Sequence, residues 1–384
     1  MTHRETFFQI VSGKRPRQPL FAPDITDWYL GQHRKRGEPS RYPPGVFISD
    51  DDPIKFDMGE GIDDKFFGMS LLDIYKKYDW GIHCHIRDWA EEYYVDGVTY
   101  SVSAGGDRKT IRYATPKGVL KRRFKLATDG SWCPVDYLLD DISQIDILFE
   151  VISATRFTLR DENIRFVTDA ISDRGQADIV INRSPFAKLL HEYLGLENTA
   201  FCIFEDFGIY KEFEKIQTEK DMELIELACG TSCDIALIYD HTDAKLVPPD
   251  WYENYCIPFY KRAGELLRKS NKLISTHVDG NLKSLLPLIK GSGLDILDGC
   301  TPAPISDYEP ETLAESLGED MSVFVGVPSS LFCDGTSIDA ICAYADRLLK
   351  AFEGRAIFNV GDILPVNGSI EHVIALGEYI KKYG

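Results

Sequence analysis

Six short apolar segments in the second half of the chain alternate with amphipathic helical patterns, and this rhythm limits the fold more than any other feature. The expected strands are 177–182 (ADIVIN), 234–240 (DIALIYD), 272–277 (KLISTH), 294–298 (LDILD), 322–327 (SVFVGV) and 356–361 (AIFNVG). Helical patterns such as WYENYCIPFYKRAGELLRKS and SIDAICAYADRLLKAF lie between them. Short apolar strands that alternate with helices are typical of a parallel sheet covered on both faces.

Two earlier segments, 19–25 (PLFAPDI) and 80–86 (WGIHCHI), raise the number of expected strands to eight. Eight strand–helix units in 384 residues predict a single-domain (β/α)8 barrel over residues 1–384. An open, doubly wound sheet is the alternative. It would usually carry a glycine-rich phosphate loop after its first strand, and the sequence has none there.

Residues 94–126 have a different character from the rest of the chain. The stretch VTYSVSAGGDRKTIRYAT places two alternating segments on either side of Gly105, Gly106 and Asp107, and GVLKRRFKLA follows as a third candidate strand. Turn residues between β-branched and aromatic flanks are typical of a hairpin. We therefore expect an antiparallel hairpin insertion within the barrel.

Charge and composition narrow the class of partner. The net charge is −18, from 61 acidic and 43 basic residues, which disfavours nucleic acid. No segment approaches the roughly 20 apolar residues of a membrane-spanning helix, and the N-terminus does not resemble a secretory signal. The nine cysteines are scattered without a CxxC pair, as expected for free thiols in a reducing cytoplasm.

Polar residues gather where the expected strands end, and this is the edge at which (β/α)8 barrels carry their chemistry. They are Asp24, His83, His85, Asn182, Arg183, Asp240, His241, His277, Asp279, Asp298, Cys300 and Asp362. Four carboxylates among them, Asp24, Asp240, Asp279 and Asp362, would repel one another at a shared mouth unless a cation or protons offset the charge. The pattern favours a metal ion or a cationic substrate.

His277 and Asp279 are the strongest candidates for metal ligands. Residues two apart on a strand share a face, so both side chains could reach one ion. Asp362 follows the last expected strand, and Cys300 is the alternative third ligand. One imidazole and two carboxylates leave a fourth position open, as in catalytic zinc sites.

Other strand-end residues receive less specific roles. Asp240 and His241 either cap a loop or act in catalysis, by contacting substrate or orienting His277, and we assign both to catalysis. His83 and His85 share a strand face and could be ligands, structural residues or substrate contacts. Candidate substrate contacts are Asp24, His83, Arg183 for a carboxylate, and Tyr239 as an aromatic wall.

Several stretches resemble the uroporphyrinogen decarboxylase superfamily. These are RETFFQIVSGKRPRQPLF near the start, GTSCDIALIYDHTDAKLVPPDWYENYCIPFYKRAGELLRKSNKLISTHVDGN in the middle, and AIFNVGDILPVNGSIEHVIALGEYIKKY at the end. The resemblance implies a barrel enzyme, often dimeric. It also implies one of two chemistries, a metal-free decarboxylation or a cobalamin-dependent methyl transfer.

The ligand positions favour the methyltransferase branch. The decarboxylases carry an arginine-rich signature of the form RQAGRY, which this sequence lacks. The methyltransferases bind zinc through His-x-Cys and a cysteine after the last strand. His277 matches the family histidine, whereas Asp279 and Asp362 fall on the two cysteine positions.

Replacing both thiolates by carboxylates has a chemical consequence. It leaves zinc, or another divalent ion, a harder Lewis acid suited to an oxygen leaving group. The resemblance thus implies the first methyltransferase of an O-demethylase system, which moves a methyl group from a small methoxylated, aromatic substrate to cob(I)alamin. The chain has no D-x-H-x-x-G motif, so the corrinoid would arrive on a separate protein. A metal-free decarboxylase and a methylcobalamin:thiol methyltransferase are the alternatives.

Overall fold

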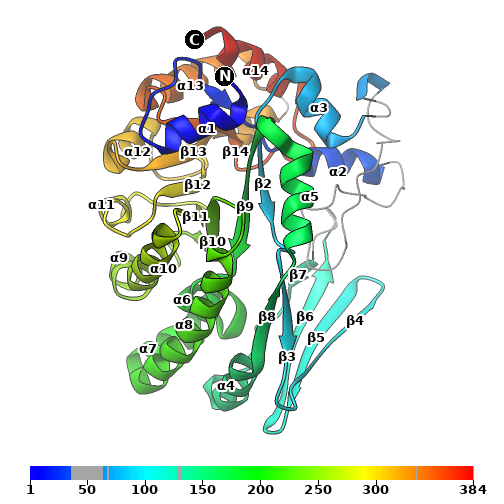
Figure 1. Ribbon diagram of the computed structural model, residues 1–384, viewed down its shortest axis with the longest axis vertical. Helices are drawn as coiled ribbons and strands as arrows, with labels where there is room; N and C mark the ends of the chain where they lie inside the picture. Colours follow the sequence, from blue (N-terminus) through cyan, green and yellow to red (C-terminus); the bar gives the residue numbers. More distant parts are fainter. Residues whose placement is uncertain (36–63, 67–68, 128–131, 334, 384) are drawn as a thin grey trace.

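The computed structural model describes the whole chain except residues 36–63, 67–68, 128–131, 334 and 384. Its main sheet has eight parallel strands in the order β1-β14-β13-β12-β11-β10-β9-β2 (Figure 1). Their bounds are β1 Leu20–Phe21, β2 Ile82–Ile86, β9 Gly175–Ile181, β10 Ile235–Thr242, β11 Leu273–Val278, β12 Ile296–Cys300, β13 Ser322–Pro328 and β14 Ala356–Gly361. Each of the eight strand predictions is confirmed by a strand within or overlapping it.

The sheet curls so that its two outer strands, β1 and β2, approach each other. The backbone N–H of Gly81, just before β2, donates to the carbonyl oxygen of Phe21 in β1 over 2.8 Å. A Cβ atom at Gly81 would lie 2.8 Å from Leu20 Cδ1 and 3.2 Å from the Phe21 oxygen, so glycine permits this approach. The (β/α)8 prediction is confirmed.

Helices surround the sheet, and α1 (His3–Val11) closes the N-terminal end of the barrel. Phe7 and Ile10 of α1 pack against the inward-facing Leu20, Ile296 and Phe324 in a separate apolar cluster. The other helices are α2 Thr26–Lys35, α3 Leu71–Tyr78, α4 Ile145–Ala154, α5 Asp161–Ile171, α6 Pro185–Lys188, α7 Gly195–Glu205, α8 Phe207–Cys229, α9 Pro249–Trp251, α10 Ile257–Lys269, α11 Leu286–Ile289, α12 Pro310–Leu317, α13 Ile338–Phe352 and α14 Ile370–Tyr383. No helix in the described part of the chain is both long and apolar enough to cross a membrane.

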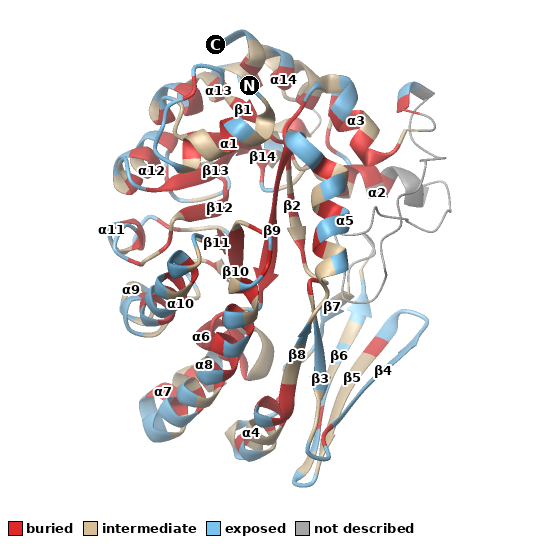
Figure 2. Cartoon of the chain, viewed as in Figure 1, coloured by how far each residue is buried: buried red, intermediate tan, exposed pale blue. Residues whose placement is uncertain are grey.

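The predicted hairpin is confirmed as part of a larger antiparallel region between β2 and β9. The strands there are β3 Ala90–Tyr94, β4 Thr99–Gly105, β5 Arg108–Thr115, β6 Gly118–Leu126, β7 Trp132–Pro134 and β8 Thr155–Leu159. Strands β4 to β7 form one sheet, and β3 pairs with β8. Figure 2 shows the barrel strands largely buried, whereas β3 and β4 are mostly exposed. This region extends away from the C-terminal end of the barrel (Figure 1).

Candidate active site

A cavity of about 1050 Å³ lies between the C-terminal ends of the barrel strands and the antiparallel region. The barrel contributes a polar wall, whose members include Asp24, His85, Tyr239, His241, His277 and Asp362. The antiparallel strands contribute a largely aromatic wall, which includes Tyr94, Tyr100, Lys109, Tyr113, Phe124 and Trp132. This combination suits a ligand with a ring and one reactive polar end.

His277 and Asp298 form the best-defined pair in the polar wall. They are direct partners across β11 and β12, and His277 Nδ1 lies 2.8 Å from Asp298 Oδ2. Burial opposes a charge on His277, but the hydrogen bond to Asp298 and the charges of Asp298 and Asp362 outweigh it and raise the pKa of His277. The other ring nitrogen, Nε2, lies 3.6 Å from Asp362 Oδ1.

Glycine at position 299 makes room for this imidazole. Its φ is +78°, and a Cβ atom there would lie 2.5 Å from His277 Cε1. Asp298 is buried, yet its pKa is well below its usual range because His277 and two further histidines, His83 and His85, offset the cost of burial. The surroundings of Asp298 therefore favour its ionised form.

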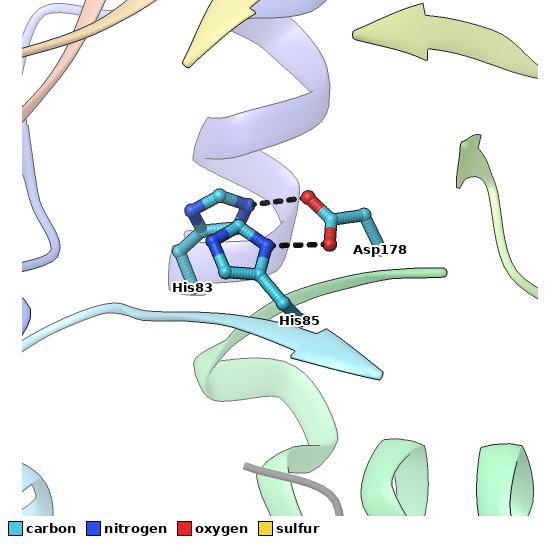
Figure 3. A group of neighbouring side chains, drawn as sticks. All are labelled: His83, His85 and Asp178. Carbon is cyan, nitrogen blue, oxygen red and sulfur yellow. Dashed lines mark hydrogen bonds and ion pairs between the residues drawn. The ribbon is translucent and has the colours of Figure 1, made fainter. Parts of the chain in front are cut away.

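A second cluster lies deeper in the barrel, where His83 and His85 converge on Asp178 (Figure 3). His83 Nε2 is 2.9 Å from Asp178 Oδ2, and His85 Nδ1 is 2.7 Å from Asp178 Oδ1. Burial opposes a charge on His85, but Asp178 and Asp298 raise its pKa to about 9. One ligand atom from each of these three residues lies within 4.8 Å of the other two. Among the described residues, this group could therefore hold a metal ion.

Two carboxyl groups at the mouth have perturbed acidity. Burial and the nearby carboxylates of Asp27 and Asp362 raise the pKa of Asp24 to about 7, although Asp24 accepts a hydrogen bond from the Thr26 backbone N–H over 2.9 Å. Burial at the mouth, with help from Asp298 and Asp279, also raises the pKa of Asp362. Asp24 is therefore poised to hold or release a proton near neutral pH.

The structure brings five of the nine site residues assigned from sequence, Asp24, Tyr239, His241, His277 and Asp362, to the wall of the large cavity. The sixth, His83, lines a smaller cavity of about 30 Å³, which shares Asp24, His85 and Asp362 with the large one. Asp240 and Arg183 are absent from the described lining residues of both.

Asp240 and Arg183 are held by contacts within the protein. Asp240 accepts from the Ser184 backbone N–H and hydroxyl, each over 2.6 Å, and from the Tyr260 hydroxyl over 2.5 Å. Tyr239 and His241 are less buried than Asp240, as the alternation of a strand requires. Arg183 donates to the Tyr239 carbonyl over 3.0 Å.

Asp279, the third expected ligand, contacts His241. Strand β11 ends at Val278, and the Asp279 carboxylate, with its side chain 61% exposed, lies 3.3 Å from His241 Nδ1. The hydrogen bond to His241 lowers the pKa of Asp279, while burial lowers that of His241 to about 4. Because Asp279 lies beyond the end of β11, the rule that residues two apart on a strand share a face does not apply to His277 and Asp279.

Two residues in or near the polar wall, Asp178 and Arg87, were not identified from the sequence. Asp178 lies inside the apolar run of β9, and a lone charge in a buried strand is the signal that would have identified it. Arg87 follows β2, and its guanidinium lies 4.1 Å from the centre of the Tyr239 ring. A cation over the ring fixes Tyr239 at the cavity edge.

Comparisons with known proteins agree with this architecture. Residues 195–383 match the family model of uroporphyrinogen decarboxylase (URO-D), and no curated protein sequence matches the chain. A methyltransferase from Methanosarcina mazei shares the fold with 12% identity and a TM-score of 0.62, over 100% of this chain and 99% of that one. A B12-independent methionine synthase from Shewanella sp. W3-18-1 is similar with 14% identity and a TM-score of 0.41, over 67% and 72% of the two chains. The family-model match and the shared fold both agree with the resemblance of the chain to the uroporphyrinogen decarboxylase superfamily.

Proposed function

We propose that this protein is a methyltransferase that moves a methyl group from a methoxylated aromatic compound to cob(I)alamin carried by a separate corrinoid protein. The observation that carries the proposal is the His277–Asp298 pair, which directs His277 Nε2 toward Asp362 in the wall of a large, partly aromatic cavity. The family-model match over residues 195–383 and the fold shared with the Methanosarcina mazei methyltransferase support it.

His277 and Asp362 fit a divalent ion such as zinc. The 3.6 Å between Nε2 and Oδ1 is too long for a hydrogen bond, and His277 is oriented through its other nitrogen by a carboxylate, as metal-binding histidines usually are. Asp279 would complete the set only by leaving His241. An ion held there would supply Lewis acidity toward an ether oxygen.

The protein's own residues would perform the remaining tasks. Tyr239, held by Arg87, and the aromatic residues of the antiparallel strands would position the ring of the substrate. The carbon–oxygen bond of the donor would break, its electron pair would stay on oxygen, and the methyl group would pass to the cob(I)alamin of the partner protein. Asp24, with a pKa of about 7, would give that oxygen a proton, so the products are a phenol and methylcobalamin.

The alternative decarboxylase function needs arginines that gather around a polycarboxylate substrate. Among the described residues that line the large cavity, the arginines are Arg87 and Arg122. Arg87 lies over Tyr239, and Arg122 donates to the His191 carbonyl over 2.8 Å. The alternative thiol methyltransferase would favour thiolate ligands for its metal ion. Cys300, the cysteine at a strand end, is fully buried, and burial raises the pKa of its thiol and so disfavours the thiolate.

The test is an optical assay with free cob(I)alamin in place of the corrinoid protein. Zinc-loaded protein is mixed with a panel of methoxybenzenes and methoxybenzoates under anaerobic, reducing conditions. We expect cob(I)alamin to be consumed, with methylcobalamin and the matching phenol formed in equal amounts. The His277→Ala and Asp24→Asn variants should slow the reaction by at least about 100-fold, the usual loss when an acid or a ligand is removed. No methylcobalamin with any member of the panel would contradict the proposal.

A further inference from the structure

The cluster of His83, His85 and Asp178 lies at the centre of the barrel, beneath the active-site cavity. Strand β2 has the burial pattern of alternation, with His83 and His85 on the inner face and Cys84 on the other. His85 and Asp178 are direct partners in the register between β2 and β9. Two imidazoles and a carboxylate are thus fixed on rigid, adjacent strands rather than on loops.

We propose that His83, His85 and Asp178 bind a divalent transition-metal ion inside the barrel. The nitrogens of His83 and His85 that face Asp178 lie 2.9 and 2.7 Å from its two oxygens, and all three ligand atoms lie within 4.8 Å of one another (Figure 3). Two neutral nitrogens and one carboxylate form a donor set that first-row divalent ions such as Zn²⁺, Fe²⁺ and Co²⁺ accept. The site is distinct from the one that His277 and Asp362 would form.

Asp298 faces both imidazoles from the other side. Its oxygens lie 3.8 Å from His83 Nδ1 and 3.7 Å from His85 Nε2. A carboxylate facing the outer nitrogen is the usual neighbour of a metal-binding histidine, because it fixes the tautomer and makes the ring a better donor. Phe324 stacks on His83 with centroids 3.9 Å apart and an interplanar angle of 14°, which holds the ring plane.

The buried charges of the cluster suit an ion. The side chains of Asp178 and Asp298 are 1% and 6% exposed. A divalent ion with two neutral imidazoles would balance the two carboxylates without any protonated ring. Metal binding would also hold β2 and β9 together where the polar wall of the active site begins.

An independent sign of a further ligand comes from Asn359 on β14. Its side-chain oxygen is buried and has no hydrogen-bond partner among the described residues. Asn359 lines the cavity of about 30 Å³ together with His83, His85 and Asp298. That volume can hold a water molecule, and a water that completes the coordination of the ion would donate to Asn359.

The test is metal binding rather than activity, so it stands apart from the proposed methyl transfer. The full chain carrying His277→Gln, which removes the other expected site, is stripped with a chelator and titrated with Co²⁺. We expect one tightly bound ion whose visible absorption reports nitrogen and oxygen ligands. Adding His85→Gln or Asp178→Asn should weaken binding by more than about 100-fold, because loss of even an outer partner of a ligand costs 10- to 100-fold.

The matched control is His372→Gln, which removes a histidine on α14 and should leave Co²⁺ affinity unchanged. Circular dichroism checks that each variant is folded. Should the His85 and Asp178 variants not fold, X-ray absorption of the Zn²⁺-loaded His277→Gln protein decides the matter, since we expect two imidazoles in its first coordination sphere. Unchanged Co²⁺ affinity in folded His85→Gln and Asp178→Asn variants, or no more than one imidazole by X-ray absorption, would overturn the proposal even if methyl transfer is observed.

Discussion

His277 Nδ1 and Asp298 Oδ2 lie 2.8 Å apart across neighbouring strands at the bottom of the large cavity. Because the two residues are in register, the sheet itself sets their contact, and the other side of the imidazole is left to face the mouth. The barrel strands therefore fix the position of the His277 imidazole in the wall of the cavity.

The first prediction concerns Asp298→Asn. Loss of the negative partner should lower the pKa of His277, which Asp298 raises in the native protein, and weaken zinc binding or activity by about 10- to 100-fold. An NMR titration of His277 in the zinc-free protein measures the pKa change. Asp295→Asn is the control, since Asp295 lies just before β12 and pairs with Arg268. An unchanged His277 titration in Asp298→Asn would show that the pair does not set its charge.

The second prediction concerns pH and Asp24. Its pKa is about 7 in the folded chain and near 3.8 in the unfolded chain, so the folded chain binds more protons between these values. The free energy of unfolding contributed by this group must therefore fall as pH rises from about 4 to about 7. Asp24→Asn cannot ionise, so we expect the variant to gain stability relative to the wild type as pH increases. Urea unfolding at several pH values, with a chelator present, checks this; parallel curves would exclude it.

The third prediction separates backbone strain from displacement of His277. Gly299→Ala and Gly13→Ala both place a side chain at positive φ, +78° and +76°, and each should cost about 1–2 kcal/mol of stability. Only Gly299→Ala brings a methyl group against His277, because nothing lies within 4 Å of a Cβ atom at Gly13. We expect a larger stability loss for Gly299→Ala, whose methyl group would also lie 2.7 Å from the Val278 carbonyl oxygen, and a loss of methyl transfer only for this variant. Equal activity in the two variants would mean that the position of His277 is not critical.

The fourth prediction concerns the aromatic wall. Phe124→Ala should weaken binding of a methoxybenzoate by about 5- to 30-fold, since a ring contact contributes about 1–2 kcal/mol. Calorimetry with the unreactive demethylated analogue measures this without any corrinoid. Phe204→Ala is the control, because that side chain is 76% exposed on α7. An equal loss in both variants would place the aromatic ring of the ligand elsewhere.

Most strands of the barrel could be predicted because they are short apolar runs bounded by polar ends, although β2 carries His83 and His85 on one face. Strand β1 is only two residues long, yet its segment was recognisable from Leu20 and Phe21. The hairpin was equally clear, since Gly106 and Asp107 form the turn between β4 and β5. These features depend on local sequence, so the fold followed from them.

The site was harder to predict because it depends on where each strand ends and which face each residue takes. Asp240 turns toward Ser184 and Tyr260, whereas Tyr239 and His241 reach the cavity. Asp279 lies one residue beyond β11 and lies within hydrogen-bond distance of His241. Partners across strands, such as His277 and Asp298, are set by register, which a single sequence does not specify.

The most direct test of the proposed function follows the methyl group itself. A methoxybenzoate with a deuterated methyl group is mixed with zinc-loaded protein and one equivalent of cob(I)alamin, and the cobalamin is analysed by mass spectrometry. We expect methylcobalamin that carries all three deuterium atoms, together with an equal amount of the phenol, and neither product with His277→Ala. Carbon dioxide released from the substrate carboxylate, with the deuterated methoxy group intact and cobalamin unmethylated, would contradict methyl transfer and favour the decarboxylase.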